Sequence, residues 1–279
     1  MELVRLACQL PEERRRSLSH WTCSELAREV VRSGLVEAIS AQTVQRILQH
    51  HRLKPWRKQY WLRNKAPRDA EFIARTNEIC ELYTRVLDAH EMVLCVDEKT
   101  SIQPRPRLAP TKPAQPDRPV QVEHEYKRAG ALQLFGAFDT RTGGVYGRTY
   151  RRKRQIEFID FLEYLDRTIP ASITVIHIVC DNVSVHHGKE VRAWLARHPR
   201  FQFHFLPVHC SWMNQVEQWF SILQSKRLAV ADFEGLDDLA AQIDSFIAQW
   251  NEIAHPFNLT RQSFAKVLAK AEAALAKVA

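Results

Sequence analysis

The chain is poor in glycine, and it has no glycine-rich loop of the kind that cradles phosphates in nucleotide-binding proteins. No run of about 18 uncharged apolar residues occurs, so no membrane-spanning segment is expected. The N-terminus lacks the basic, apolar and small-residue order of a signal peptide. We therefore expect a cytoplasmic protein with no membrane partner, and the missing loop argues against a nucleotide or other small-molecule substrate.

Cysteine pairs are also missing, because no two of the cysteines form a C-x-x-C motif or show the spacing of a zinc finger. Reduced and mostly buried thiols are the expected state, and a structural zinc site is not expected. The six cysteines are residues 8, 23, 80, 95, 180 and 210.

The positive charge is confined to the first quarter of the chain. Residues 1–68 hold 14 Lys/Arg and 6 Asp/Glu, whereas residues 69–279 hold 26 of each, so the whole net charge of +8 lies in the first segment. With 279 residues and 45% apolar content, the chain can form one large core and a small accessory module. The charge distribution favours a module that binds a polyanion, joined to a part with another task. A solvated basic face remains the alternative.

The basic segment contains the pattern of two short helices. Thr22 and Glu25 have the spacing of a capping box, the apolar residues after them recur at helical intervals, and Gly34 supplies a stop, which predicts a helix over 23–33. Ser40 can cap a second helix that runs to about residue 50. The outer face of this second helix carries Gln42, Gln45, Arg46 and Gln49.

Two helices with this arrangement are typical of a helix-turn-helix module, here residues 1–52, whose second helix enters the major groove of DNA. Gln and Arg can form paired hydrogen bonds with the edges of adenine and guanine. An ordinary helical hairpin is an equally good interpretation when the charge is left aside. A leading helix that starts at Pro11 is also expected.

A basic, aromatic segment follows at residues 53–69, and we expect it to be a linker that tracks DNA rather than a plain tether. Its cations can neutralise phosphates, and its aromatic side chains Trp56, Tyr60 and Trp61 can pack on the module or lie against sugars or bases. The DNA-contact candidates in this linker are Lys54, Trp56, Arg57, Lys58 and Arg63.

Residues 70–279 have the pattern of an α/β domain with a mixed, five-stranded sheet flanked by helices. Helices are predicted over 70–87, 156–168 and 187–197, and a further one follows residue 211. Strands are predicted over 92–97, 132–138, 144–150, 173–180 and 201–206, the second and third being joined by a turn that starts at Asp139.

Three acidic residues occupy positions from which they can meet. Asp97 and Asp181 each follow an apolar strand, and Glu217 borders the predicted buried stripe of a helix. That stripe consists of Trp212, Val216, Trp219, Phe220 and Leu223. Glu98 alternates to the face opposite Asp97, and turn chemistry alone explains Asp139. Taken singly, each of the three acids is more often a solvated or capping residue, but their joint placement favours a site.

Carboxylates that converge on one point suit a hard divalent cation such as Mg²⁺. Two such ions can activate an attacking oxygen and stabilise a leaving oxygen at phosphorus. The sequence therefore predicts an enzyme of phosphoryl transfer that acts on nucleic acid.

Four ordered motifs resemble the catalytic core of mariner-superfamily DDE transposases in their bacterial insertion-sequence branch. The resemblance runs from about residue 20 to 265, and 35 residues separate Asp181 from Glu217, which fits the compact second interval of that family. The motifs are Val-Asp-Glu-Lys-Thr at 96–100, His-Glu-Tyr-Lys-Arg-Ala-Gly at 124–130, Cys-Asp-Asn-Val-Ser-Val-His at 180–186 and Leu-Pro-Val-His-Cys-Ser-Trp-Met-Asn-Gln-Val-Glu at 206–217.

The resemblance implies a ribonuclease H-like catalytic domain in which Asp97, Asp181 and Glu217 bind two Mg²⁺ ions, with Mn²⁺ as a substitute. It implies that double-stranded DNA is cut at terminal inverted repeats and that the freed 3′ ends attack target DNA at a TA dinucleotide. A homodimer that joins two DNA ends and a bacterial, nucleoid-associated protein are expected with it. Asn182, His186 and Asn214 would then support the acids or contact DNA near them.

The chain departs from the family pattern in its DNA-binding part. Family members commonly carry two helix-turn-helix modules before the catalytic domain, and only about 20 residues precede the one found here, so the first module is expected to be missing. A truncated, non-mobile repressor of a related element and a general ribonuclease H-like nuclease therefore remain alternatives to an active transposase.

Overall fold

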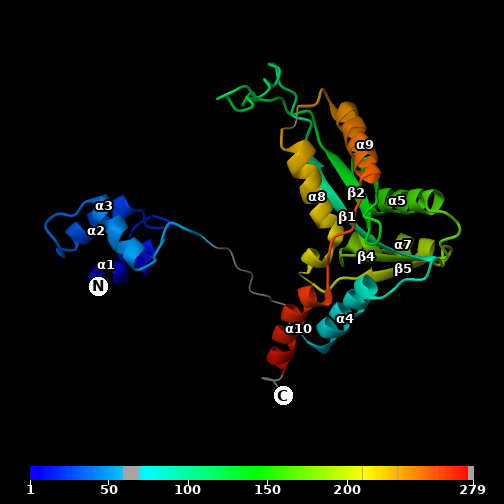
Figure 1. The fold of residues 1–279 in the computed structure, drawn as a ribbon, viewed down its shortest axis with the longest axis horizontal. Coiled ribbons are helices and arrows are strands. Elements are labelled where there is room, and N and C mark those ends of the chain that lie inside the picture. The colour runs from blue at the N-terminus through cyan, green and yellow to red at the C-terminus, as the bar shows by residue number, and fades with distance from the viewer. Residues whose placement is uncertain (59–68, 209, 231, 276–279) are drawn as a thin grey trace. The chain divides into compact units, whose positions relative to one another are not determined.

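The computed structural model describes residues 1–58, 69–208, 210–230 and 232–275, and the chain divides into two compact units, Met1–Arg63 and Asn64–Ala279 (Figure 1). Within these described ranges, none of the helices combines the length and apolarity that crossing a bilayer requires. The first unit is all-helical, and the second contains the sheet.

Residues 1–58, the described part of the first unit, contain three helices and one 3-10 turn around a small apolar core. Trp21 is buried in this core and donates from its indole nitrogen to the carbonyl of Gln9 at 2.8 Å. The core is lined by Leu6, Leu26, Val44 and Leu48, all fully buried. The elements are α1 (Glu2–Ala7), the 3-10 turn Pro11–Arg14, α2 (Cys23–Arg32) and α3 (Ala41–His50).

Local capping sets the bounds of α2 and α3, as the sequence predicts. The Thr22 hydroxyl accepts the N–H of Glu25, and the Glu25 carboxylate accepts the N–H of Thr22 at 2.8 Å, which is a complete capping box. Gly34 has a φ of +69° and follows the end of α2. Ser40 caps α3 by accepting the N–H of Thr43 at 3.1 Å. The predicted leading helix at Pro11 is wrong, because only one 3-10 turn forms there.

The second unit is built on a mixed five-stranded sheet in the order β3-β2-β1-β4-β5. β1 pairs antiparallel with β2, and β2 pairs antiparallel with β3, whereas β1, β4 and β5 are parallel. This confirms the predicted mixed sheet. The strands are β1 (Glu91–Ile102), β2 (Leu132–Asp139), β3 (Val145–Tyr150), β4 (Val175–Cys180) and β5 (Phe201–Phe205).

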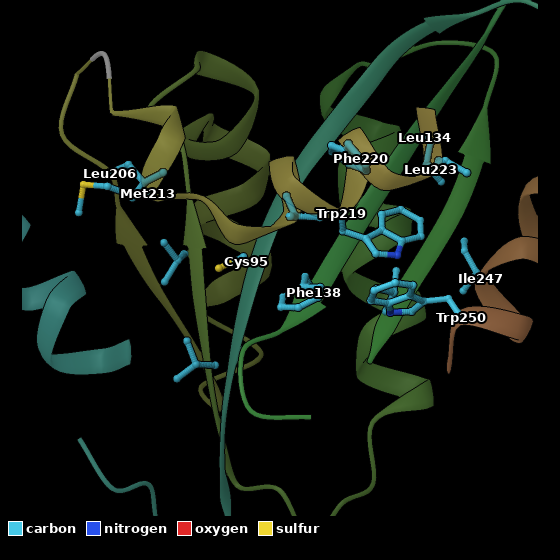
Figure 2. Close-up of a cluster of buried hydrophobic side chains, with 14 of the residues drawn as sticks. Cys95, Leu134, Phe138, Leu206, Met213, Trp219, Phe220, Leu223, Ile247 and Trp250 are labelled. Carbon is cyan, nitrogen blue, oxygen red and sulfur yellow. The ribbon is translucent and has the colours of Figure 1, made fainter. Parts of the chain in front are cut away.

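Helices cover both faces of the sheet. The face that carries Val96 and Phe135 packs against α5 and α7, and the opposite face packs against a cluster to which α4, α8, α9 and α10 contribute. In Figure 2, Trp219 of α8 lies beside Phe138 of β2 and Trp250 of α9. The helices are α4 (Ala70–Thr84), α5 (Gln155–Thr168), α6 (Ser184–His187), α7 (Lys189–Leu195), α8 (Gln215–Leu223), α9 (Leu236–Glu252) and α10 (Arg261–Leu275).

Two predicted helices differ from those observed. The helix that starts at Ala70 ends at Thr84 rather than at residue 87, so Val86 lies outside it and is 94% exposed. The helix predicted over 187–197 is α7, which is shorter than predicted (Lys189–Leu195), and the extended backbone at Gly188 (φ −64°, ψ 169°) separates it from α6.

The turn between β2 and β3 has the expected chemistry. Oδ1 of Asp139 accepts the N–H of Arg141 at 2.9 Å, and Oδ2 accepts the hydroxyl of Thr142 at 2.6 Å. Gly143 has a φ of +77°, which favours glycine. Asp139 is therefore a structural residue of the hairpin, as predicted.

Candidate active site

The parallel pairing of β1 and β4 brings Asp97 and Asp181 to one region of the sheet. Cys95 of β1 lies opposite Val179 of β4, so Asp97 and Asp181 stand two residues further along their strands at a common level. Asp97 still belongs to β1 and is buried, with 8% of its surface exposed. Asp181 follows the last residue of β4 and is half-buried.

Glu217 reaches the same region from the first turn of α8. This helix packs closely on β2 at Gly136, the partner of Asp97 in the β1–β2 register. A Cβ atom at Gly136 would lie 2.9 Å from the Phe220 ring, so the close approach of α8 needs glycine there. Glu217 itself is exposed, and it stands on the part of α8 that meets the Asp97 level of the sheet.

The pKa shifts indicate that the charges of the three carboxylates interact. Burial, together with repulsion from Asp181 and Glu217, raises the pKa of Asp97 to about 7, although the N–H of Glu98 donates to it at 2.8 Å. Burial also raises the pKa of Glu217, and the charge of Asp181 adds to that effect. The three acids named from the sequence therefore lie near enough for their charges to interact.

The donor set suits a hard divalent cation, because it consists of carboxylates whose mutual repulsion a cation would relieve. In the described part of the chain, no three His, Cys, Asp or Glu side chains stand close enough to hold one ion. The acids therefore approach near enough to repel each other, but as they stand they do not form a closed set of ligands. The residue types fit Mg²⁺ or Mn²⁺, but the three carboxylates stand too far apart to bind one ion together.

Asn214 links the strand and helix that carry two of these acids. Its side chain is fully buried, and Nδ2 donates to the Val96 carbonyl at 3.0 Å and to Oδ2 of Asp97 at 3.2 Å. Its backbone carbonyl accepts the N–H of Glu217 at 3.1 Å. The predicted supporting residue Asn214 thus lies at the centre of the site.

His186 joins Asp181 to a residue that sequence analysis set aside. Nδ1 of His186 lies 2.9 Å from Oδ1 of Asp181, and Nε2 lies 3.0 Å from Oε1 of Glu98. Burial favours the neutral ring, but hydrogen bonds with Asp181, Cys180 and Glu98 raise the pKa of His186 to about 12, so the ring is an imidazolium. The same contact keeps the pKa of Asp181 below its usual value against the effect of burial.

Glu98 and Lys99 are parts of the site that the sequence analysis did not assign. Glu98 does face away from Asp97, as predicted, but its buried carboxylate thereby meets His186 on the other side of the sheet. Lys99 returns to the Asp97 face. Burial lowers the pKa of Lys99, while the nearby charge of Glu217 acts to raise it. The strand alternation over 97–99 was the available signal for both residues.

Two other residues near the acids in the sequence, Asn182 and Trp212, are exposed. Asn182 is exposed beside Asp181. Trp212 was predicted in the buried stripe of the helix, but it is 41% exposed. The reason is that residues Ser211–Met213 form a separate 3-10 turn, and α8 begins only at Gln215. Four of the five predicted stripe residues, Val216, Trp219, Phe220 and Leu223, are buried.

The predicted DNA-contact residues of the first unit lie on its surface. Gln42, Gln45, Arg46 and Gln49 are all exposed along one side of α3, opposite the buried Val44 and Leu48. Lys54, Arg57 and Lys58 are exposed as well. Trp56 is partly buried against the core of this unit, which leaves less of its ring for a ligand. Arg63, Tyr60 and Trp61 lie outside the described residues.

Comparison with known proteins identifies related chains. The model of the family described as DDE superfamily endonuclease matches residues 92–240, just over half of the 279 residues. A protein of Shigella sonnei, the insertion element IS630 uncharacterized 39 kDa protein, is 28% identical over 134 residues. That match spans 48% of this chain and 38% of the relative.

Two solved structures share the fold. The Mos1 mariner paired end complex with Mn matches with a TM-score of 0.54 and 17% identity, over 99% of this chain and 77% of that one. The Mos1 strand transfer complex matches with a TM-score of 0.52 and 16% identity, over 99% and 76% of the two chains. Together with the strand order of the sheet, this likeness confirms the predicted ribonuclease H-like fold.

Proposed function

This chain belongs to the DDE superfamily endonuclease family, and from that premise we propose that it is a metal-dependent DNA transposase of the mariner and IS630 type. The observation that carries the proposal is the electrostatic coupling of Asp97 with Asp181 and Glu217, because repulsion from these two acids adds to burial in raising the pKa of Asp97 to about 7. An acidic cluster of this kind has no evident structural use, because it opposes folding. It suits a site that works with a bound cation.

In this proposal, Asp97, Asp181 and Glu217 hold two Mg²⁺ ions, for which Mn²⁺ can substitute. When bound, such ions activate an attacking oxygen and stabilise the leaving oxygen at phosphorus. The side chains around the acids have positioning tasks. Asn214 orients the Asp97 carboxylate through its 3.2 Å hydrogen bond, and His186 fixes that of Asp181 through its 2.9 Å contact.

The DNA substrate is proposed from the first unit. An α3 face that exposes Gln42, Gln45, Arg46 and Gln49 has the side chains that read bases in a major groove. Three exposed cations follow α3 in the sequence and can neutralise DNA phosphates: Lys54, Arg57 and Lys58. We infer that this unit binds the terminal inverted repeats of a mobile element, while the acids cut its ends and join them to target DNA at TA.

A homodimer on DNA follows from the same proposal, since two element ends must be processed together. The match to the Shigella sonnei protein covers 38% of that relative, so activity as a complete transposase is an inference about this chain. Its expected place is the bacterial nucleoid.

The test is cleavage of a labelled duplex that carries the inverted repeat from the DNA flanking the gene, with and without Mg²⁺. Asp97→Asn, Asp181→Asn and Glu217→Gln are each expected to abolish cutting. Glu190→Gln, which alters an exposed acid of α7, is the matched control and should cut like the unmodified chain. Equal cutting by all five proteins would refute the triad, and specific binding without cutting by the unmodified chain would favour a repressor.

A further inference from the structure

Residues 69–279 are neutral as a whole, but four consecutive basic residues interrupt that balance between β3 and α5. These residues, Arg151-Arg152-Lys153-Arg154, are all exposed. Arg151 lies 3.6 Å from Asp237, and Arg154 pairs with Glu157 at 2.6 Å. Over the part of the chain that the structure describes, no ion pair involves Arg152 or Lys153. Two cations of this segment therefore have no ion-pair partner among the described residues.

The sheet brings this basic segment to the same edge as the acids. β3 and β1 are both antiparallel to β2, so they run in the same direction. Asp97 of β1 pairs with Gly136 of β2, and Gly136 pairs with Gly147 of β3. From Gly147, β3 continues for three residues to Tyr150, and the basic segment follows it. β1, β3 and β4 therefore run in the same direction, so Asp97, Asp181 and Arg151 lie toward the same side of the sheet, although β1 continues past Asp97 to Ile102.

Contacts of α5 bring the segment close to Asp181. A Cβ atom at Gly188 would lie 1.3 Å from Nε2 of Gln155, so the start of α5 lies directly against the end of α6. One turn later, the Phe158 ring is 4.6 Å from the imidazole of His186, which contacts Asp181. Lys153 is also near enough to act on the carboxylate. Burial opposes the ionisation of Asp181, and His186 and then Lys153 act to lower its pKa.

We propose that Arg152 and Lys153 bind backbone phosphates of the DNA strand that enters the carboxylate site beside Asp181. The inference rests on the proposed function, and it adds a DNA contact within residues 69–279, which composition alone represents as neutral. Guanidinium and ammonium groups without internal partners bind phosphate oxygens strongly, and they set the register of a strand without reading its sequence. Cations at this edge also counter the repulsion between DNA and three carboxylates.

Two DNA segments offer the same chemistry. One is the DNA that flanks the element end before it is cut, and the other is target DNA. The shared ligand is a phosphodiester backbone, so the binding test uses three labelled duplexes: the repeat with flanking DNA, the repeat ending at the cut, and a duplex of random sequence.

The variant Arg152→Gln/Lys153→Gln is compared with Arg167→Gln/Arg197→Gln in the full chain. Arg167 and Arg197 are exposed, and their substitution removes the same two positive charges. They precede the starts of β4 and β5, at the side of the sheet opposite to the acids. The slope of log Kd against log salt should become shallower by about 2 for the first variant on at least one duplex, since each phosphate contact contributes about 0.9. The control should keep the slope of the unmodified chain.

The pattern over the three duplexes identifies the source. A change only on the repeat with flanking DNA assigns the contact to the flank, and a change on the random duplex assigns it to target DNA. Slopes equal to those of the control on all three duplexes would overturn the inference, whether or not any protein cuts DNA. Failure of the unmodified chain to cut would instead count against the proposed transposase.

Discussion

Nδ2 of Asn214 donates to Oδ2 of Asp97 at 3.2 Å, across 117 residues of sequence. The same amide also donates to the Val96 carbonyl, and the Asn214 backbone carbonyl accepts the N–H of Glu217. One buried side chain thus couples the strand that carries the first acid to the helix that carries the third. Removal of this side chain is therefore expected to change the spacing of Asp97 and Glu217.

Asn214→Ala is expected to lower the free energy of unfolding by about 1–3 kcal/mol, because the buried Val96 carbonyl loses its amide donor. It should also slow cleavage by more than this stability loss explains, since the Asp97 carboxylate is no longer oriented. Denaturant unfolding and single-turnover cleavage measure the two effects. Asn251→Ala is the matched control, because Asn251 also bonds to backbone groups, those of Val145. Equal slowing by both variants would contradict the positioning role.

Stability should fall as the pH rises through the range in which Asp97 ionises. The pKa of Asp97 is raised to about 7 in the folded chain, against about 3.9 when unfolded, so the folded state holds this proton more firmly. The stabilisation is complete below about pH 4 and is lost as the pH approaches and passes 7. Asp97→Asn should therefore be more stable than the unmodified chain at pH 8, by up to about 4 kcal/mol, and no more stable at pH 4.

Thermal unfolding in EDTA at the two pH values measures this difference. Mg²⁺ binds the ionised carboxylates, so it should raise the Tm of the unmodified chain more at pH 8 than at pH 5. Asp97→Asn should lose most of that Mg²⁺ response. A variant that is equally stabilised at both pH values would indicate a packing effect in place of the predicted ionisation.

His186→Gln should destabilise the fold by about 3–5 kcal/mol, because it removes a buried cation and leaves the Glu98 carboxylate buried and unpaired. Glu98→Gln should have a smaller effect, since the imidazolium keeps its contact with Asp181. The double variant tests the coupling. Its loss should be smaller than the sum of the two single losses, because no lone charge remains buried. Additive losses in denaturant unfolding would show that the two residues are independent.

The comparison of Asp97 with Glu98 illustrates what the sequence could predict. Apolar runs were enough to select Asp97 and Asp181, because parallel neighbouring strands bring the residues that follow such runs to one region of the sheet. Capping chemistry likewise predicted the start of α2 at Cys23. Both signals are local, so they can be recognised without knowledge of the tertiary contacts. The predicted strand end at residue 97 is wrong, because β1 continues to Ile102.

Tertiary contacts decided the features that the sequence analysis missed. Glu98 meets His186 across 88 residues, and no local spacing encodes that pair. Trp212 fitted the helical period, but the 3-10 turn Ser211–Met213 breaks the phase before α8 begins, and the ring stays exposed. The basic run at 151–154 was hidden in a neutral total charge until the sheet register put it near Asp181.

Two substitutions in the first unit, one on α3 and one after it, should separate base reading from phosphate binding. Gln45→Ala is expected to reduce discrimination at one base pair of the repeat, by about 1–3 kcal/mol, with an unchanged salt slope. Lys58→Ala, which removes an exposed cation outside α3, should weaken all duplexes alike and make the slope shallower by about 1. Fluorescence anisotropy with repeat and random duplexes measures both. If Gln45→Ala also weakens all duplexes alike, α3 does not read bases through this residue.

Gly136→Ala should impair the site through packing alone. The added Cβ would lie 2.9 Å from the Phe220 ring and 3.4 Å from Cγ2 of Val216, so α8 would have to move away from β2, and Glu217 would move with it. Overpacking of this kind costs about 1–3 kcal/mol of stability. Phe220→Leu in the same chain removes the ring atoms that collide, so the double variant should regain cleavage relative to Gly136→Ala, whereas Phe220→Leu alone should lose stability through a cavity. Cleavage that stays intact in Gly136→Ala would show that the distance between α8 and β2 does not control Glu217.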